Sequence, residues 1–287
     1  SYTQSFDLYG SSGALPEMSK NIIFLLFLIG FGTKAGLIPL HVWLPHAHPA
    51  APSNVSALMS GIMIKTAIYG MLRFVHCYLG IEQAWWGLLI LTLGMISVFL
   101  GVAYALMEGN IKRLLAFSSV ENIGIILIGL GVCFIAFAHE QVLLGSFALT
   151  AALLHTFNHS LFKGGLFLGA GAIQYSTQTK DMEKLGGLSK RIPVTAFFVL
   201  CFSLAISAII PFNGFIGEWL TFQALFANIL PGQTGIDILL ILAVAALGLA
   251  GGLVIACFVK FFGISFLGLP RSEQALQAKE VPLTMNI

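Results

Sequence analysis

The chain has 287 residues, of which 57% are hydrophobic and 9% are charged. Soluble domains carry about 25% charged residues, so this chain has too little polar surface to coat a soluble globule, and we infer that lipid surrounds most of it. The formal net charge is +2 and no basic run resembles a nucleic-acid-binding patch. The four cysteines are far apart and form no CxxC pair, which argues against a disulfide framework, a zinc site or an iron–sulfur cluster on this chain.

Seven apolar runs follow a polar, Gly/Ser-rich segment at residues 1–19, which we expect to be a loop or a surface segment. The runs cover residues 20–44, 54–75, 84–107, 113–137, 142–173, 193–227 and 236–268. Each run has the roughly 20 residues that a helix needs to cross a bilayer. The sequence therefore predicts an all-α, polytopic bundle of about seven transmembrane helices.

Two of these runs contain residues that interrupt helices. Residues 20–44 contain Pro39 among several glycines, and residues 193–227 contain Pro211 within IIPFNGFIGE. Proline removes a helix hydrogen bond and clashes with the preceding turn, and a break inside a membrane survives only where protein or water satisfies the freed backbone. We expect both helices to be broken there. The two lie five helices apart, as inverted repeats would place them.

The lysines and arginines outside the apolar runs predict the orientation of the chain. If successive loops alternate in side, eight of these residues fall on one side and only Lys20 and Arg73 fall on the other. The eight are Lys112, Arg113, Lys180, Lys184, Lys190, Arg191, Arg271 and Lys279. Because positive residues concentrate in cytoplasmic loops, we expect residues 108–113 and 174–192 to be cytoplasmic.

Lysines also occur inside the apolar runs. A charge near the bilayer centre costs at least about 2.5–3.5 kcal/mol, so such a lysine needs a partner or water. Counting residues from the start of each run places Lys34 and Lys65 at similar depths near mid-membrane. From that depth, snorkelling of the amine to the interface is inadequate, which favours a functional role; for Lys260, near the cytoplasmic end of its run, snorkelling is the preferred interpretation.

The run 142–173 contains HTFNHSLFKGG, in which His155, His159 and Lys163 are spaced by four residues and share one helical face. Histidine titrates near neutral pH and can pass a proton between its ring nitrogens, so a proton relay is one interpretation. A metal site is a second, although no carboxylate or cysteine neighbours these residues in sequence. Simple hydrogen bonds between helices are a third.

Two acidic residues lie within the apolar runs. Glu218 follows the break at Pro211, where it could hold a proton, pair with a lysine, or cap the second half of the helix. Glu121 lies near the start of the run 113–137, and it is either buried or placed at the cytoplasmic side.

Three histidines cluster in PLHVWLPHAHPAAPS, after the first break: His41, His46 and His48. This segment either admits protons from the cytoplasm or forms a rigid, proline-rich turn with polar decoration, and the turn is the preferred interpretation. Glu121 is a further candidate for the cytoplasmic entrance.

The string FGTKAGLIPLHVWLPHAHPAAPSNVSALMSGIMIKTAIYGMLRF resembles the signature of antiporter-like subunits. Such subunits occur in respiratory complex I, in multisubunit Na+/H+ antiporters and in membrane-bound hydrogenases. Further matching motifs are NIKRLLAFSSVENIG, HTFNHSLFKGGLFLGAGAI, DMEKLGGLSKRIP and PFNGFIGEW. The resemblance covers most of residues 20–270, and its several long motifs make it specific.

Members of this family typically have 14 helices, and the seven runs resemble the seventh to the thirteenth. Because the chain starts without methionine and ends in VPLTMNI, which looks like the beginning of a helix, we expect both ends to be truncations of a longer protein. The resemblance implies a missing first half. Residues 20–83 would end the first repeat, 84–268 would form a five-helix second repeat, and 269–287 would form a cytoplasmic loop and the start of a further helix. The family's central polar axis maps onto Lys34, Lys65, the groups of the run 142–173 and Glu218. In the family, a glutamate on the fifth helix pairs with the lysine that Lys34 matches.

Two departures place the chain within the family. His46 replaces the acid that members often have in the WLP-D-AH turn, and SVENIG at residues 119–124 replaces SVSHMG. The second departure resembles the hydrogenase-associated branch. This implies a proton-translocating subunit with no redox centre of its own, in an inner-membrane complex whose soluble partners carry nickel–iron and iron–sulfur centres. A Na+/H+ antiporter subunit and a non-pumping scaffold remain alternatives.

Overall fold

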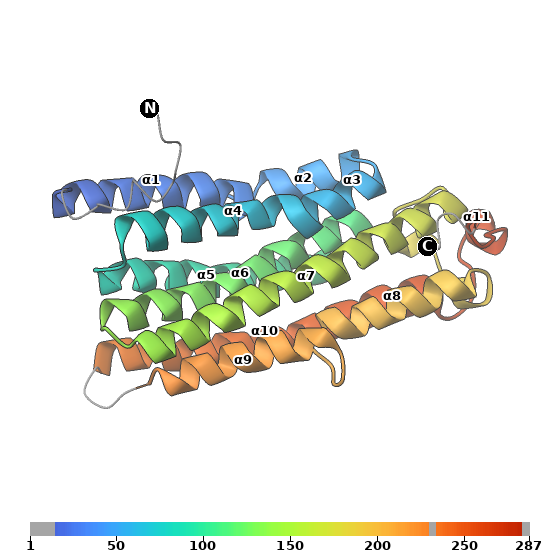
Figure 1. The fold of residues 1–287 in the computed structure, drawn as a ribbon. Helices are drawn as coiled ribbons and strands as arrows, with labels where there is room; N and C mark the ends of the chain where they lie inside the picture. The colour runs from blue at the N-terminus through green and yellow to red at the C-terminus, as the bar shows by residue number, and fades with distance from the viewer. Residues whose placement is uncertain (1–14, 230–233, 283–287) are drawn as a thin grey trace.

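A computed structural model describes residues 15–229 and 234–282 as a bundle of long helices that lie side by side, with the chain reversing direction between them (Figure 1). The α-helices are α1 (Glu17–Ala35), α2 (Trp43–Ala50), α3 (Ser53–Leu58), α4 (Ile64–Met71), α5 (Ala84–Met107), α6 (Ile111–Ala138), α7 (Val142–Thr177), α8 (Pro193–Ile206), α9 (Asn213–Ala227), α10 (Thr234–Phe266) and α11 (Glu273–Leu276). Two π-helical segments, η3 (Met59–Met63) and η4 (Leu72–Leu79), continue α3 and α4, and two short 3₁₀ turns, η5 (Met182–Lys184) and η6 (Leu188–Lys190), follow α7. The all-α fold is as predicted.

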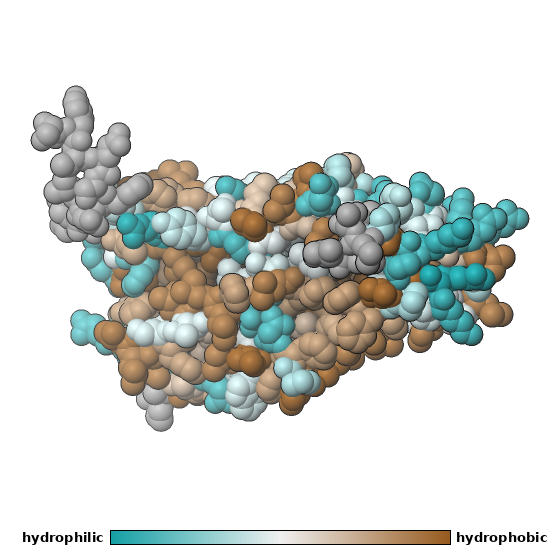
Figure 2. All heavy atoms as spheres, turned by 45° about the vertical axis from the view of Figure 1, so that its right-hand side comes forward, coloured by the Kyte–Doolittle hydropathy of each residue, from teal (hydrophilic) through white to brown (hydrophobic). Residues whose placement is uncertain are grey.

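Six helices in the described part of the chain are long and apolar enough to cross a membrane: Glu17–Ala35, Ser53–Leu79, Ala84–Met107, Ile111–Ala138, Val142–Thr177 and Gly235–Phe266. The seventh predicted crossing, residues 193–227, is divided between α8 and α9. Apolar side chains cover much of the visible face along the middle of the bundle, and polar ones gather at the right-hand end in Figure 2. This arrangement is typical of a protein that meets lipid along its length and water at its ends.

The first break lies where it was predicted, but α1 is shorter than the apolar run, because it ends at Ala35 rather than near residue 44. Gly36 adopts a left-handed conformation (φ 83°), which residues with a side chain rarely adopt and which ends the helix. The interrupted backbone finds partners in the bundle: Ile38 N donates to Ser97 Oγ at 3.1 Å. The indole of Trp43 donates to the carbonyl of Thr33 at 2.7 Å. Protein contacts thus support this break, as a membrane interior requires.

The second break separates α8 from α9 around Pro211, again as predicted. The start of α9 passes so close to the end of α8 that a Cβ on Gly214 would overlap the carbonyl oxygen of Ala205. Glycine is therefore required at this crossing.

Helix α6 is the centre of the bundle: 94% of its membrane-length window is buried. Its residues after Asn122 are apolar all round, as expected of a helix that other helices surround. Its N-terminus is capped by Asn110, whose side chain accepts from the backbone N–H groups of Lys112 and Arg113. The buried candidate site residues lie on α6 itself or on α2, α7 and α9, which pack against it.

The last part of the chain was predicted to hold a loop and the start of a further helix. The structure has the one-turn helix α11 and extended chain up to residue 282. Residues 283–287, and residues 1–14 of the predicted polar segment, lie outside the described residues. The proposed division into two repeats stays a prediction.

Candidate functional site

Three ionisable side chains of α7 form one buried stripe. His155 is 1% exposed, and His159 and Lys163 are 0% exposed. They follow one another every four residues, so the face of α7 predicted from their spacing is the face that is buried. Lys163 is the twenty-second residue of a 36-residue helix and therefore lies far from both ends.

Lys163 binds to α6. Its ammonium donates to the carbonyl of Leu115 at 2.9 Å and to the hydroxyl of Ser118 at 2.5 Å. Among the ion pairs of the described residues, none includes Lys163. The amine is thus held by neutral oxygens, and Glu121 acts on it electrostatically without forming an ion pair.

Hydrogen bonds continue from Ser118 to one of the histidines and to a carboxylate, whereas both ring nitrogens of His159 lack hydrogen-bond partners among the described residues. Asn122 donates to the carbonyl of Ser118 at 2.9 Å and also to the carboxylate of Glu121. Its amide oxygen lies 3.3 Å from His155 Nε2. Asn122 therefore connects a lysine, a histidine and a carboxyl group that come from two helices.

Glu218 brings a second carboxyl group to the same region from α9. It is buried, and it lies close enough to Glu121 to interact with it electrostatically. Gly217 makes this possible, since a Cβ there would lie 2.6 Å from His155 Nδ1. Glu218 is the sixth residue of α9 and makes no cap hydrogen bond, so the capping interpretation does not hold. It also lines a mainly apolar groove of about 410 Å³ that α10 completes.

A pair of asparagines fixes the start of α9 against α7. Asn158 donates to the carbonyl of Asn213 at 2.8 Å, and Asn213 donates back to the Asn158 side chain at 3.3 Å. The pair joins α7 to the first residue of α9. It also sets the position of α9, and so of Glu218, relative to His155.

Lys65 approaches the stripe from the other side, on α4. Its amine donates to the carbonyl of Ser60, five residues earlier, within the π-helical segment η3. Ser60 in turn shares a hydrogen bond of 2.8 Å with Ser119 of α6. Lys65 acts electrostatically on His155 and His159 and is itself influenced by Lys163. It is half-buried and lines a groove of about 380 Å³ between α4 and α7.

Lys34 lies on the surface of the described bundle, apart from the buried stripe of α7. Its expected mid-depth position beside Lys65 stays a prediction. The buried positions of α1 are Lys20, Phe24, Leu28, Gly32 and Ala35, which follow one stripe. Lys34 is two residues, and so about 200°, away from Gly32 on the helix and faces outward. Its pairing with a glutamate of a preceding helix stays a prediction.

Of the two positions expected for Glu121, buried or at the cytoplasmic side, the structure has the buried one. As a candidate for admitting protons it was expected at the cytoplasmic side, but it is 1% exposed, in the interior with Asn122.

The three histidines after the first break are not equivalent. His46 is exposed and His41 is half-buried beside Tyr104 and Phe117. His48 is fully buried: its ring stacks on Phe167 with 4.5 Å between centroids, and both ring nitrogens lack hydrogen-bond partners among the described residues. Burial, with smaller contributions from Lys163, Lys112 and Lys65, lowers the pKa of His48 to about 3.

Sequence reasoning missed the polar groups that join the ionisable ones. These are Ser60, Ser118, Ser119, Asn122, Asn158 and Asn213. A signal was available, since Ser118 and Asn122 are four residues apart in a helix that is otherwise apolar for most of its length. As to the metal alternative, no three His, Cys, Asp or Glu side chains of the described residues gather closely enough to hold an ion.

Comparison with known proteins identifies the family. Residues 5–247 match the family described as NADH:quinone oxidoreductase/Mrp antiporter, TM. The chain belongs to this family. The resemblance seen in its motifs is thereby confirmed.

Individual relatives support the hydrogenase-associated branch. The chain is 52% identical over 267 residues to hydrogenase-4 component B of Escherichia coli (strain K12), which is 92% of this chain and 40% of that protein. It is 43% identical over 265 residues to formate hydrogenlyase subunit 3 of the same strain, 92% of this chain and 43% of that protein. The chain thus spans less than half the length of either relative.

A solved structure supports the fold. The Mrp complex from Dietzia sp. DQ12-45-1b contains a chain that superimposes with a TM-score of 0.79 at 25% identity, over 96% of this chain and 49% of that one. The antiporter-like arrangement of helices is therefore shared with an Mrp subunit.

Proposed function

We propose that this chain is part of a proton-translocating membrane subunit of a hydrogenase-type, complex I-like oxidoreductase complex. The observation that carries the proposal is a buried hydrogen-bond network, in which Lys163 donates to the Ser118 hydroxyl while Asn122 joins the Ser118 carbonyl, His155 and Glu121. Glu218 acts electrostatically on Glu121, and Lys65 acts on both histidines. Buried ionisable groups in a membrane protein line the pathways of ions or protons.

The arrangement can couple distant proton movements. Lys65 and Lys163 influence one another, and so do Glu121 and Glu218. Because like charges disfavour each other in a low-dielectric interior, a proton gained at one group lowers the proton affinity of its neighbour. Histidines between the two pairs can accept a proton at one ring nitrogen and release it from the other. A proton that binds to one of these groups therefore favours the release of a proton from another.

The redox chemistry would take place on partner subunits. We expect soluble subunits with nickel–iron and iron–sulfur centres, further membrane subunits, and an inner-membrane location. The likeness to hydrogenase-4 component B and formate hydrogenlyase subunit 3 supports this assignment. Isolation of the intact complex tests it: a nickel–iron hydrogenase subunit should co-purify, and co-purification with antiporter subunits alone would contradict it.

Lys65 provides the test of proton translocation. Arginine keeps the charge of lysine but does not deprotonate in proteins, so Lys65→Arg should block transfer as fully as Lys65→Ala. Proton flux is measured with the reconstituted complex, and subunit content shows whether each variant assembles. Lys260→Arg is the matched control. Lys260 donates to the carbonyls of Leu106 and Glu108, and arginine can make the same hydrogen bonds. Normal flux in assembled Lys65→Arg would exclude Lys65 from the pathway.

A Na+/H+ antiporter subunit is the second candidate, and the likeness to an Mrp subunit favours it. The two candidates differ in the ion that must be present. The first predicts proton flux that is unchanged when sodium is removed from both sides of the vesicle. Flux that requires sodium would support the antiporter.

A further inference from the structure

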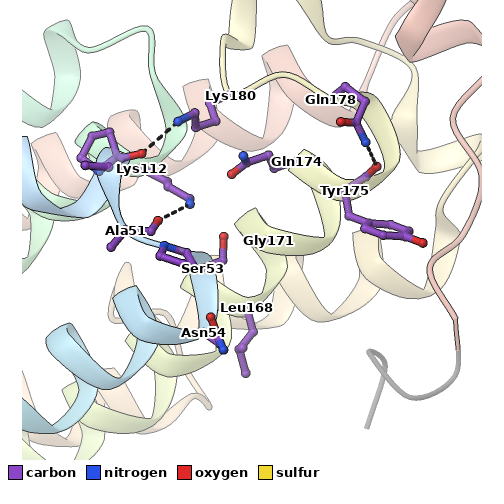
Figure 3. Close-up of a pocket in the computed structure, with 13 residues that line it drawn as sticks. Ala51, Ser53, Asn54, Lys112, Leu168, Gly171, Gln174, Tyr175, Gln178 and Lys180 are labelled. Atoms are coloured by element: carbon purple, nitrogen blue, oxygen red, sulfur yellow. Dashed lines mark hydrogen bonds between the residues drawn. The ribbon is translucent and has the colours of Figure 1, made fainter.

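A large cavity lies at the basic end of the bundle, away from the buried hydrogen-bond network. It measures about 760 Å³ and is open on one side, between the turn that joins α2 to α3, the start of α6 and the last turns of α7 (Figure 3). Its polar lining residues are Ser53, Asn54, Lys112, Gln174, Gln178 and Lys180. No carboxylate of the described residues lines it.

Two lysines provide positive charge at this cavity. Lys112 is 2% exposed and donates to the carbonyl of Ala51 at 2.9 Å, and Lys180 donates to the carbonyl of Pro49 at 2.9 Å. The two are close enough to interact electrostatically. Neither takes part in an ion pair of the described residues. Each ammonium has three N–H donors, so charge and donors remain for an anion.

Gln174 adds an uncommitted polar group to the same space. Its amide lies between the lysines and the last turn of α7 in Figure 3. Its buried Oε1, an acceptor, has no hydrogen-bond partner in the described residues, and its Nε2 is the group that can donate to an anion. The Ser53 hydroxyl faces the cavity from below. Gly171 lets α3 and α7 close that floor, since a Cβ there would lie 2.7 Å from Ser53 Cβ.

The open side of the cavity is apolar and lies at the end of a membrane span. Leu168 and Tyr175 line it and are 55% and 57% exposed, and α7 ends at Thr177. An anion here would sit at the level of lipid head groups, with an apolar strip along α7 leading toward the membrane interior. Basic pockets between helices at this level suit anionic lipids.

We propose that this cavity binds a phosphate group, that of an anionic phospholipid, with Lys112 and Lys180 as its counter-charges and Gln174 as an additional donor. The acyl chains would follow Leu168 along α7. Each of the two ammonium groups donates to a single carbonyl and has further N–H donors. A phosphodiester offers several acceptor oxygens for those donors.

The test uses the full-length protein in its complex, purified with lipid and analysed by native mass spectrometry for retained phosphatidylglycerol. The double variant Lys112→Gln/Lys180→Gln should bind this lipid about tenfold more weakly or worse, since it loses two charge-assisted contacts. The matched control is Lys184→Gln/Lys190→Gln, which removes two exposed lysines from the same end of the molecule. Equal lipid retention in all three proteins would overturn the proposal.

A second variant separates binding from folding. Gln174→Glu introduces a carboxylate beside the two lysines, so it should preserve or improve the fold while it repels the phosphate. Loss of phosphatidylglycerol with an unchanged melting temperature supports the site, whereas unchanged lipid binding overturns it. Inorganic phosphate is the other arm: if it protects the complex against unfolding in this cavity while phosphatidylglycerol in nanodiscs does not bind, the lipid source is wrong.

Discussion

At the residue scale, Asn122 is the side chain on which the buried hydrogen-bond network depends most. It contacts Ser118, Glu121 and His155, and it is 1% exposed. Its amide donates to two oxygens and its oxygen faces a ring nitrogen, so every part of the side chain is used. Such a network is stable when each member is satisfied and costly when one is removed.

Replacing Asn122 by leucine tests this role. The change leaves Glu121 and His155 without a partner in the interior, and it should destabilise the protein by about 1–3 kcal/mol. Proton flux should be lost even at temperatures where the variant is folded, because the hydrogen bonds that join Ser118 to the histidine are gone. Thr150→Val is the control: this exposed hydroxyl of α7 bonds only to its own helix, at Ser146. Normal flux in Asn122→Leu would show that protons take another route.

His48 gives a second prediction, on pH. Its pKa is about 3 in the folded protein, below the ordinary value of 6.5, because burial and three nearby lysines disfavour its charged form. Between these two values the unfolded chain binds more protons than the folded one, so this histidine makes the protein less stable as pH falls. The melting temperature of wild type should therefore drop more steeply from pH 7 to pH 5 than that of His48→Gln.

The exposed His46 of the same helix is the control for that experiment. His46→Gln should retain the steep dependence of the wild type. If His48→Gln and wild type lose stability equally, the buried environment of His48 is not what limits stability in acid.

At the element scale, the packing of α5 on α6 depends on small residues spaced by seven. These are Gly87, Gly94 and Gly101 on α5, and Gly124 and Gly131 on α6. A Cβ on any of them would lie 2.6 to 3.0 Å from an atom of the opposite helix. Close backbone approach of this kind is a common way for helices to associate in lipid.

Gly101→Ala tests this seam beside the buried hydrogen-bond network. The new Cβ would lie 2.6 Å from the backbone nitrogen of Glu121, so α5 and α6 must separate or distort. We expect a loss of about 1–3 kcal/mol, as for other overpacked sites, seen as a lower melting temperature of the complex. The same change at Gly248 of α10, which has nothing within 4 Å, should leave it unchanged or raise it. A tolerated Gly101→Ala would mean that the two helices can move apart at little cost.

At the scale of the whole molecule, the basic loops meet at one end. The backbone nitrogen of Ile111 donates to Lys180 O at 3.0 Å, and Met182 N donates to Gly109 O at 3.0 Å. Arg271 donates to the Met182 carbonyl at 2.9 Å. The loops 108–113 and 174–192 therefore lie together, as the charge distribution predicted. Which side of the membrane they face is not a property of the bundle and stays a prediction.

Sided labelling tests the orientation. In a background without the four native cysteines, single cysteines at Arg113 and Lys184 should react with an impermeant reagent only from the cytoplasm. A cysteine at Glu140, in the loop between α6 and α7 at the other end, should react only from the opposite side. Reaction of Arg113→Cys and Lys184→Cys from different sides would refute the topology.

The sequence by itself determined the features that depend on local chemistry. Apolar length gave the crossings, proline and glycine gave the two breaks at Pro39 and Pro211, and lysine and arginine gave the basic end. The stripe of His155, His159 and Lys163 also followed from spacing alone, because residues four apart share a face of any α-helix.

Only the tertiary structure decided which polar groups meet. Depth follows from the rise per residue, but the direction in which a side chain points depends on how the helix packs. Lys34, for example, lies on the outward face of α1, which its position along the helix could not indicate. Helix α6 is buried on all sides, so its sequence could not indicate which neighbour each polar residue meets, and the meeting of Glu121 and Asn122 with His155 became visible only when α7 and α9 were packed around it.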